Sequence, residues 1–537
     1  MSVEAPPDPV SDQMADGSLG ASRRVDWRFL TGEPFPSVVV TAGRPERALL
    51  AGLSVVAGSV RHGGADGIAA PLTVVAGAID DDGVRRAIDR VPPGGWLAVE
   101  TGGALRRVRR ATRGGSPPST TAVAGRMRDV GYDDVSIHLA VPRRSAPTAF
   151  VSLTGRGSLA AWLERGRTSG KARIARLVRL TIPEGARGRV LAAVAPDALV
   201  VGRRPPGETP ATRPSDWLRS RLAEVPANEL GDIDPATADI LLLTPRFHAS
   251  GHVVALVVAR DGGGWRPTLV IKAARLAAGR STLGPELAAL RDLGPTLGAS
   301  GRAPRVVAAD VEGSPPWLIE TALVGRPLDA ATVRRDRSGA TDAVAAFVRA
   351  LPVRRDAGDA PGRLALEGLA RLDAAGVAAD LVARTRALAA GLDEDMPAVV
   401  EHGDLAHPNL LLRPDGSLAA VDWERAQPAG WPLHDLTVAL GYIAAAAAGA
   451  SSPSDQAAAV RRALIGDDAW ATPHIEAELA RLAIDRRAGL ALMTIAWMRT
   501  AAFLAGRAGG DWLEGDRSIA LWRTTLELAE RGPETST

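Results

Sequence analysis

Residues 401–424, EHGDLAHPNLLLRPDGSLAAVDWE, restrict the fold of this chain more than any other segment. The apolar stretches LLL and LAAV flank Pro-Asp-Gly, which favours a tight turn between two strands. A hairpin centred near Asp415 places Asn409 opposite the residue before Asp422. Asp404 lies five residues before Asn409, on the segment that leads into the first strand. We therefore expect Asp404, Asn409 and Asp422 to meet at the open end of one hairpin.

This trio of polar side chains predicts a metal site. Two carboxylates and an amide oxygen form a hard oxygen site, which suits Mg²⁺. Magnesium usually shares its coordination sphere with substrate phosphates, so the site indicates a bound nucleotide. The alternative is a solvated loop, because Asp, Asn and Gly are also common turn residues. The apolar strands beside the trio, and the His-Gly before Asp404, favour the metal site.

The lysine content of the chain is unusual. Only Lys171 and Lys272 occur, against 62 arginines. Lys272 lies in the apolar strand LVIKAAR, where its compact ammonium suits a phosphate contact. The alternative is a surface lysine whose stem covers apolar surface.

The same strand belongs to a second expected hairpin, HVVALVVAR-DGGGW-RPTLVIKAA. Folding it about Gly263 places Lys272 opposite Val254, beside the loop RFHASGH at residues 246–252. In that loop, Ser250 and Gly251 are placed to cover phosphates with backbone N–H groups.

A helix, PELAALRDL, follows this hairpin. Glu286 shares a helical face with Leu290 and Leu293, so its carboxylate is expected to point inward. Two explanations stay open. The carboxylate pairs with Lys272, or it is an acidic residue favoured by the dipole of the first helical turn.

The rest of the chain predicts an α/β region followed by an α+β region. Short apolar strands alternate with helices up to about residue 201, which is typical of a parallel sheet. After a Pro-rich linker, a small β-rich lobe precedes a larger, mostly helical one. The expected parts are a disordered tail at 1–22, an α/β domain at 23–202, a linker at 203–215, a β-rich lobe at 216–325 and a helical lobe at 326–537.

Composition restricts partners and compartment. The net charge of +3 gives no sign of nucleic-acid binding, and the longest apolar run, Val438 to Ala450, is too short to cross a bilayer. Cysteine is absent and no signal peptide is recognisable, so we expect a cytoplasmic protein. The sequence does not indicate an oligomeric state.

Residues 216–537 resemble the aminoglycoside phosphotransferase and choline kinase family, whose fold is a bilobal, protein-kinase-like one. HGDLAHPN is similar to the catalytic loop of that family, and VDWE is similar to its metal-binding strand end. The resemblance implies Mg²⁺ and ATP as cofactors and a small-molecule hydroxyl as phosphate acceptor.

This resemblance also implies roles for the candidate residues. Asp404 is the catalytic base, and Asn409 and Asp422 hold Mg²⁺. Lys272 contacts the α- and β-phosphates, and Glu286 orients that lysine. The segment from Glu320 to Ala322 is similar to the hinge that meets adenine.

Residues 23–155 resemble the Rossmann-like class I S-adenosylmethionine-dependent methyltransferases, through DWRFL, DRVPPGGWLAVE and GYDDVSIHLAVP. The turn after the first strand departs from that family. It contains Gly43 alone, followed by Arg44 and Pro45, which crowd the turn and remove an N–H. We therefore do not expect S-adenosylmethionine to bind, and we expect an interaction or regulatory domain.

Two alternatives to a small-molecule kinase remain at this stage. One is a bifunctional enzyme whose first domain still methylates. The other is a non-catalytic pseudokinase that acts as an interaction scaffold, against which the joint presence of Asp404, Asn409, Asp422 and Lys272 argues.

Overall fold

The structure, a computed structural model, describes most of the chain and divides it into two compact units. It describes residues 18–62, 70–77, 81–102, 119–165, 182–194, 197–207, 216–244, 251–277, 283–392, 396–464, 468–508 and 516–531. The sheet unit comprises the described residues of 15–281 and 307–322, and the helical unit those of 282–306 and 323–537. These units are bounded differently from the predicted domains, because strands on both sides of the predicted linker share one sheet.

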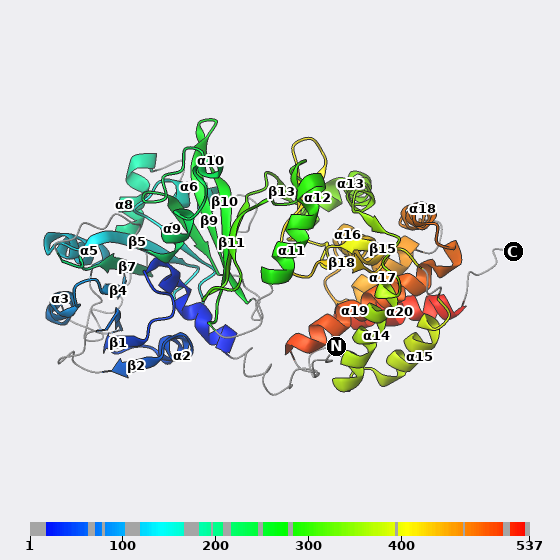
Figure 1. Cartoon of the computed structure of the whole chain (residues 1–537), viewed down its shortest axis with the longest axis horizontal. Helices are drawn as coiled ribbons and strands as arrows, with labels where there is room; N and C mark the ends of the chain where they lie inside the picture. Colours follow the sequence, from blue (N-terminus) through cyan, green and yellow to red (C-terminus); the bar gives the residue numbers. More distant parts are fainter. Residues whose placement is uncertain are drawn as a thin grey trace. The chain divides into compact units, whose positions relative to one another are not determined.

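Among its described residues, the sheet unit contains a single sheet of twelve strands (Figure 1). In spatial order these are β11 (Val306–Asp310), β12 (Trp317–Thr321), β10 (Gly264–Ala274), β9 (His252–Asp261), β8 (Asp239–Leu243), β6 (Ala149–Ser152), β5 (Asp133–Val141), β7 (Ala198–Arg203), β4 (Trp96–Thr101), β3 (Leu72–Ala76), β1 (Val38–Gly43) and β2 (Ser59–His62).

The type of strand pairing changes once along this sheet, from parallel to antiparallel. Strands β2, β1, β3 and β4 are parallel, which confirms the parallel arrangement predicted for the first strands. From β4 onward the pairings through β7, β5, β6, β8, β9, β10 and β12 are antiparallel. The parallel sheet expected up to about residue 201 is therefore wrong for β5, β6 and β7. The pairing of β6 with β8 joins the expected α/β domain to the expected β-rich lobe.

The apolar core explains why the sheet is continuous. Leu72 and Val74 of β3 belong to the same buried cluster as Leu269 and Ile271 of β10, far along the sheet. The next residue, Val75, belongs to a separate cluster on the opposite side of β3. Alternate residues are thus buried on both faces, as expected for a sheet covered on both sides.

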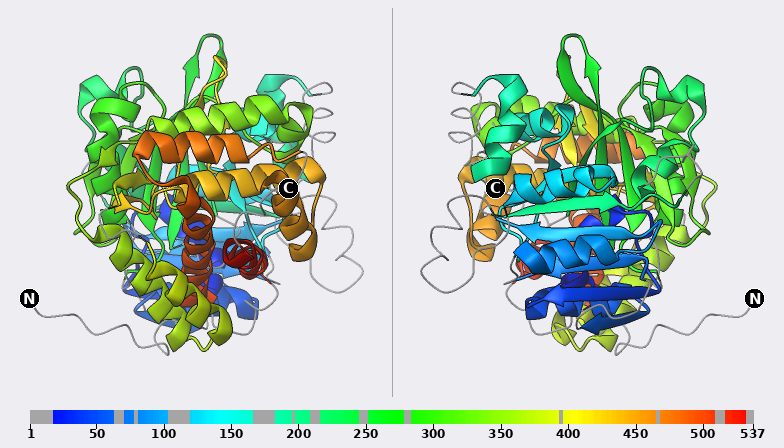
Figure 2. Two further views of the ribbon diagram at one scale, coloured as in Figure 1. Left: turned by 90° about the vertical axis from the view of Figure 1, so that its right-hand side faces the viewer. Right: turned by 90° about the vertical axis from the view of Figure 1, so that its left-hand side faces the viewer.

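Helices connect and cover these strands. In Figure 2, the right-hand view shows blue and cyan helices in front of strands of the same colours. The helices of the sheet unit are η1 (Arg23–Leu30), α2 (Arg47–Val56), α3 (Asp81–Arg90), α5 (Thr120–Asp129), α6 (Gly157–Arg165), α8 (Glu184–Val194), α9 (Trp217–Leu222) and α10 (Ala227–Leu230). Residues 1–17 of the expected disordered tail lie outside the described residues.

The helical unit is mostly α-helical, as predicted, and Figure 2 shows its green, orange and red helices in the left-hand view. Its helices are α11 (Leu283–Leu293), η3 (Gly294–Gly298), α12 (Ala330–Arg335), α13 (Arg337–Arg349), α14 (Ala360–Ala374), α15 (Ala379–Ala389), α16 (His434–Ala448), α17 (Pro453–Leu464), α18 (Thr472–Leu482), η4 (Arg486–Ala488), α19 (Gly489–Ala508) and α20 (Arg517–Arg531). Two small sheets complete it: β13 (Arg326–Pro327), β16 (Leu410–Leu412) and β17 (Leu418–Ala420), and β14 (Val353–Arg354), β15 (Ala398–Glu401) and β18 (Gln427–Gly430).

One apolar helix stands out in this unit. Among the described residues, Arg486–Ala505 is long and apolar enough to cross a membrane, and 67% of its most apolar window is buried inside the protein. The helices α16 and α17 meet the same criterion only if they count as one span bent by 108°. Helix α19 packs against α14, α16 and α20, as core helices of this composition do.

Candidate active site

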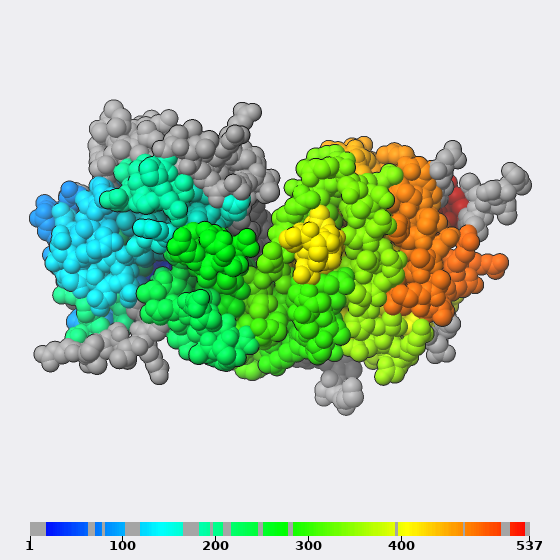
Figure 3. All heavy atoms as spheres, turned by 90° about the horizontal axis from the view of Figure 1, so that it is seen from above, coloured from blue at the N-terminus to red at the C-terminus, as the bar shows by residue number. Residues whose placement is uncertain are grey.

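The predicted hairpin lies in the helical unit with the expected register. Leu410 pairs with Ala420, and the Val421 N–H donates to the Asn409 carbonyl at 3.0 Å. The turn at residues 414–416 is exposed, and Figure 3 shows a yellow patch of this part of the chain at the surface. The polar trio therefore lies at the open end of the hairpin, opposite the turn.

Asp404 and Asn409 are in direct contact. The Asn409 Nδ2 donates to the Asp404 carbonyl at 3.1 Å and to its carboxylate oxygen Oδ2 at 3.2 Å. Asn409 is buried, whereas 44% of the Asp404 side chain is exposed. Because Nδ2 is used in these bonds, the Asn409 Oδ1 is the atom left to face a cation.

Asp422 adopts a strained backbone conformation. Its φ of 69° lies in the left-handed region, which few residues other than glycine adopt. The next residue, Trp423, donates its N–H to Glu286 Oε1 of α11 at 3.0 Å. Glu286 is fully buried, which confirms that its carboxylate points inward. Such strain persists where surrounding contacts hold it, and it is frequent at functional sites.

His402 braces the loop between these groups, as its position in the sequence suggests. The Asp404 N–H donates to its Nδ1 at 3.3 Å, and its Nε2 donates to the Val421 carbonyl at 3.0 Å. Its ring also packs against Trp423, with centroids 4.5 Å apart. One imidazole thus ties the Asp404 segment to the strand that precedes Asp422.

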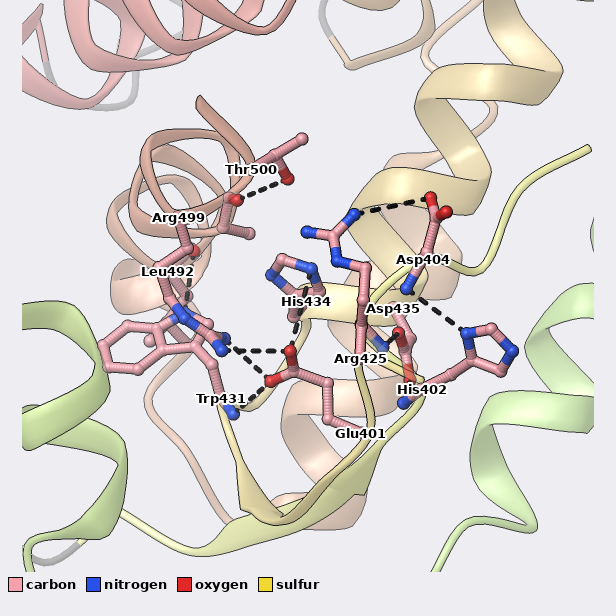
Figure 4. A network of polar contacts seen from close by, with 12 residues as sticks. Glu401, His402, Asp404, Arg425, Trp431, His434, Asp435, Leu492, Arg499 and Thr500 are labelled. Carbon is pink, nitrogen blue, oxygen red and sulfur yellow. Dashed lines mark hydrogen bonds and ion pairs between the residues drawn. The ribbon is translucent and has the colours of Figure 1, made fainter. Parts of the chain in front are cut away.

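Gly403 is required by the close approach of two segments. Its φ is 80°, and a Cβ atom there would lie 2.6 Å from the Arg425 carbonyl oxygen. The side chain of Arg425 reaches the other way, and its Nη1 lies 3.7 Å from Asp404 Oδ1. Figure 4 shows the Arg425 guanidinium and the Asp404 carboxylate facing each other. The guanidinium also stacks 3.5 Å from the ring centroid of Phe503.

A buried polar network supports this loop from behind (Figure 4). Asp435, at the start of α16, accepts the N–H groups of His402 at 2.6 Å and Gly403 at 2.9 Å. Glu401 accepts from Arg499 at 2.7 and 3.0 Å and from the Trp431 N–H at 2.7 Å. The loop therefore depends on residues from α16, α19 and the position directly after β18.

Burial and charge shift the pKa values of this network in different directions. Burial, and then the nearby Glu401 charge, raise the pKa of Asp435 to about 7 against its two N–H bonds. Burial would also raise the pKa of Glu401, but Arg499, His434 and the hydrogen bonds outweigh it and lower that pKa to about 2. Burial lowers the pKa of His434 to about 4, against the attraction of Glu401. The imidazole of His434 is therefore neutral at pH 7.

The sheet unit carries the other predicted residues. Lys272 pairs with Val254, as predicted, and its Nζ lies 3.3 Å from Glu320 Oε1 on the neighbouring strand β12. Both side chains are buried. Burial raises the pKa of Glu320, and the Lys272 charge opposes that rise. Glu320 was predicted from its place in the hinge-like segment, and its ion pair with Lys272 was not.

Two further predictions concern backbone groups. The Ala322 N–H donates to the Thr268 carbonyl at 2.9 Å, so β10 engages this N–H of the segment expected to meet adenine. The Gly251 carbonyl accepts from the Arg275 N–H at 2.7 Å. Ser250 lies outside the described residues. Lys272 and Glu286 belong to different units. That Glu286 orients Lys272 therefore stays a prediction.

The predicted Mg²⁺ site has only two proposed protein ligands, Asn409 and Asp422. Within the described ranges, no group of three or more His, Asp or Glu side chains is arranged to hold an ion. A site at the hairpin mouth would therefore take Asp422 and the Asn409 amide oxygen, with further oxygens from phosphates and water.

Comparison with known proteins supports a phosphotransferase. Residues 246–483 match the profile described as the phosphotransferase enzyme family. This match supports an enzyme that phosphorylates a hydroxyl group, as predicted. No curated protein matched the chain.

Solved structures overlap the chain only loosely. Aminoglycoside phosphotransferase APH(3'')-Id from Streptomyces rimosus is 20% identical, with 52% of this chain and 97% of that chain covered and a TM-score of 0.30. Choline kinase LicA from Streptococcus pneumoniae is 13% identical, with 54% and 92% covered and a TM-score of 0.33. At TM-scores this low the overlaps carry no argument about function.

Proposed function

We propose that this enzyme transfers the γ-phosphoryl group of ATP to a hydroxyl group of a small molecule such as a sugar, an amino alcohol or an aminoglycoside. The observation that carries the proposal is the contact of Asp404 with Asn409 beside the strained Asp422. A half-exposed carboxylate next to an amide oxygen and a second carboxylate is the arrangement that phosphoryl transfer needs.

In the proposed reaction, Asp404 accepts the proton of the acceptor hydroxyl. The hydroxyl oxygen forms the new bond to the γ-phosphorus, and the bond between that phosphorus and the β,γ-bridging oxygen breaks, which releases ADP. Asn409 fixes the Asp404 carboxylate and presents its own Oδ1 toward a cation. Mg²⁺, when bound by Asn409 and Asp422, supplies neutralisation of phosphate charge.

The sheet-unit residues are assigned by their chemistry. We propose that Lys272 contacts the α- and β-phosphates, because a buried ammonium held at 3.3 Å by Glu320 is a fixed point charge. Glu286 would keep its predicted role toward Lys272, and it also fixes the backbone at Trp423. The segment from Glu320 to Ala322 and the loop at Gly251 would meet adenine and phosphates, respectively.

The test is ADP release measured against a panel of sugars, amino alcohols and aminoglycosides. With the acceptor found, Asp404→Asn should lower kcat by about 10³-fold, roughly 4 kcal/mol, with ATP binding retained in calorimetry. The matched control is Asp415→Asn, an exposed carboxylate on the turn of the same hairpin, which should leave kcat unchanged. Equal rates for the two variants, or no turnover of any panel member, would refute the proposal.

We further propose that the parallel part of the sheet is a methyltransferase-like scaffold without S-adenosylmethionine. The turns after β1 and β3 touch: the Arg44 N–H donates to the Ala76 carbonyl at 2.9 Å. A Cβ on Gly77 would lie 1.9 Å from the Arg44 carbonyl oxygen, so the two turns leave no space between them there. Heat released on titrating S-adenosylmethionine into the full chain would instead favour the bifunctional enzyme.

A further inference from the structure

The end of strand β10 is joined to the N-terminal segment η1 by a buried ion cluster. The side chains of Asp26, Arg28 and Arg275 are fully buried. The Arg275 Nε donates to Asp26 Oδ1 at 3.1 Å, and its Nη2 lies 3.1 Å from Oδ2. Such two-point contact of a guanidinium with a carboxylate fixes direction as well as distance.

Arg28 holds the main chain at the same place. Its Nη2 donates to the Arg275 carbonyl oxygen, and its Nη1 donates to Asp26 Oδ1 at 3.3 Å. Its guanidinium lies 4.6 Å from the ring centroid of Phe29 and 5.3 Å from that of Phe35. Both the side chain and the backbone of Arg275 are therefore held by η1.

Arg275 also joins the two strands of the hairpin that carries the predicted phosphate contacts. Its N–H donates to the Gly251 carbonyl at 2.7 Å, directly before β9 begins. Lys272 lies three residues before Arg275 on β10. One residue therefore couples η1 to Gly251 and to the strand of Lys272.

Side-chain alternation extends this contact along the strand. Ile271 and Ala273 pack in one core cluster with Trp27 and Phe29 of the N-terminal segment. Lys272 lies between them in sequence and points to the opposite face, where it meets Glu320. The face of β10 behind Lys272 is thus built partly from η1.

We propose that Asp26 and Arg28 are positioning residues for Lys272. The segment η1 therefore contributes to phosphoryl transfer by holding the strand that carries Lys272. Without their contacts, the end of the β9–β10 hairpin would lose the bonds that hold the side chain and the carbonyl of Arg275. A lysine on a four-carbon stem reaches phosphates only if its own strand is held. The catalytic part of this inference rests on the proposed function of Lys272.

The test uses the full chain with Asp26→Asn, which keeps the size of the side chain and removes its charge. We expect the KM for ATP to rise about tenfold, with a smaller change in kcat. The second readout is the rate at which an amine-reactive reagent labels Lys272. Because the chain has only two lysines, peptide mapping separates Lys272 from Lys171. We expect labelling of Lys272 to become at least threefold faster.

The matched control is Asp216→Asn. Asp216 is equally a buried carboxylate of the sheet unit, and it pairs with Arg219 at the start of α9. Both variants are compared below their unfolding temperatures. The inference is overturned if Asp26→Asn changes Lys272 labelling and the KM for ATP no more than Asp216→Asn does. If the unaltered chain does not turn over ATP, the proposed function is refuted. The comparison of Lys272 labelling rates between the two variants would still decide this inference.

Because a buried charge is removed, Asp26→Asn can fail to fold, and a second measurement covers that outcome. Hydrogen exchange on the unaltered chain should show the amides of residues 270–275 and of 23–30 opening together. Fast exchange of 270–275 while 23–30 stays protected would overturn the proposed coupling.

Discussion

Glu401→Gln tests how far the loop at residues 402–409 depends on the buried network behind it. The pKa of Glu401 is lowered from 4.5 to about 2, because Arg499, His434 and hydrogen bonds outweigh the effect of burial. At about 1.4 kcal/mol per pKa unit, that shift corresponds to roughly 3 kcal/mol of folding free energy. Glutamine keeps the shape of the side chain but leaves the guanidinium of Arg499 without its carboxylate.

The sign of the pH dependence follows from the direction of the shift. A carboxylate whose pKa is lower in the folded state stabilises the protein above its unfolded pKa, near 4.5 for Glu401. This stability is lost as the pH falls from about 4.5 through 2. We therefore expect Glu401→Gln to be less stable than the unaltered chain by about 3 kcal/mol at pH 7, with the difference shrinking below pH 4.5.

Urea unfolding of both proteins at pH 7, 5 and 3.5 measures this difference in the free energy of unfolding. Hydrogen exchange of residues 398–412 then shows whether the change lies in this part of the helical unit. Glu478→Gln is the control, because Glu478 is a buried carboxylate that pairs with Arg481 on α18, away from the loop in the chain. Equal stability of Glu401→Gln and the unaltered chain at pH 7 would refute the reasoning. So would a difference that stays constant down to pH 3.5.

Two further predictions concern the same loop. Asp435→Asn leaves one acceptor for the two N–H groups of His402 and Gly403, so kcat should fall by about tenfold or more. Because the pKa of Asp435 is raised to about 7, its contribution to stability is full below about 4 and lost as the pH rises through 7. Denaturation curves should therefore show the variant gaining stability relative to the unaltered chain between pH 4 and 7. Gly403→Ala should cost about 2–4 kcal/mol in urea unfolding, because its Cβ would meet the Arg425 carbonyl at a positive φ.

Local features of the fold could be predicted from the sequence because each depends on a short stretch of chain. Counting outward from Asp415 placed the register of that hairpin correctly. Counting from Gly263 placed Lys272 opposite Val254 correctly, but nearer the turn the register is shifted by an irregularity between Pro267 and Leu269. Turn residues and apolar runs were sufficient signals there. The inward carboxylate of Glu286 followed from helical spacing in the same way.

Contacts between distant segments could not be predicted. Nothing in the sequences of β6 and β8 marks them as partners, since any short apolar strand fits a sheet edge equally well. Glu401 and Arg499 are 98 positions apart, and one arginine among 62 carries no distinguishing signal. The prediction of separate domains on either side of residues 203–215 therefore missed that one sheet contains strands from both.

The same kind of contact nevertheless holds the backbone in both units. In each, a buried arginine–carboxylate pair holds the backbone beside a segment with a predicted catalytic role: Arg275 with Asp26 next to the strand of Lys272, and Arg499 with Glu401 two residues before Gly403. A planar guanidinium fixes two bonds at once, which the single nitrogen of a lysine ammonium does not do with the same geometry. An ammonium instead acts as a compact point charge, which is the role proposed for Lys272 toward the phosphates. In this chain, arginine holds the backbone beside the predicted site, and lysine is kept for the predicted phosphate contact. Arg275→Lys should therefore loosen the strand that carries Lys272, even though the charge is kept.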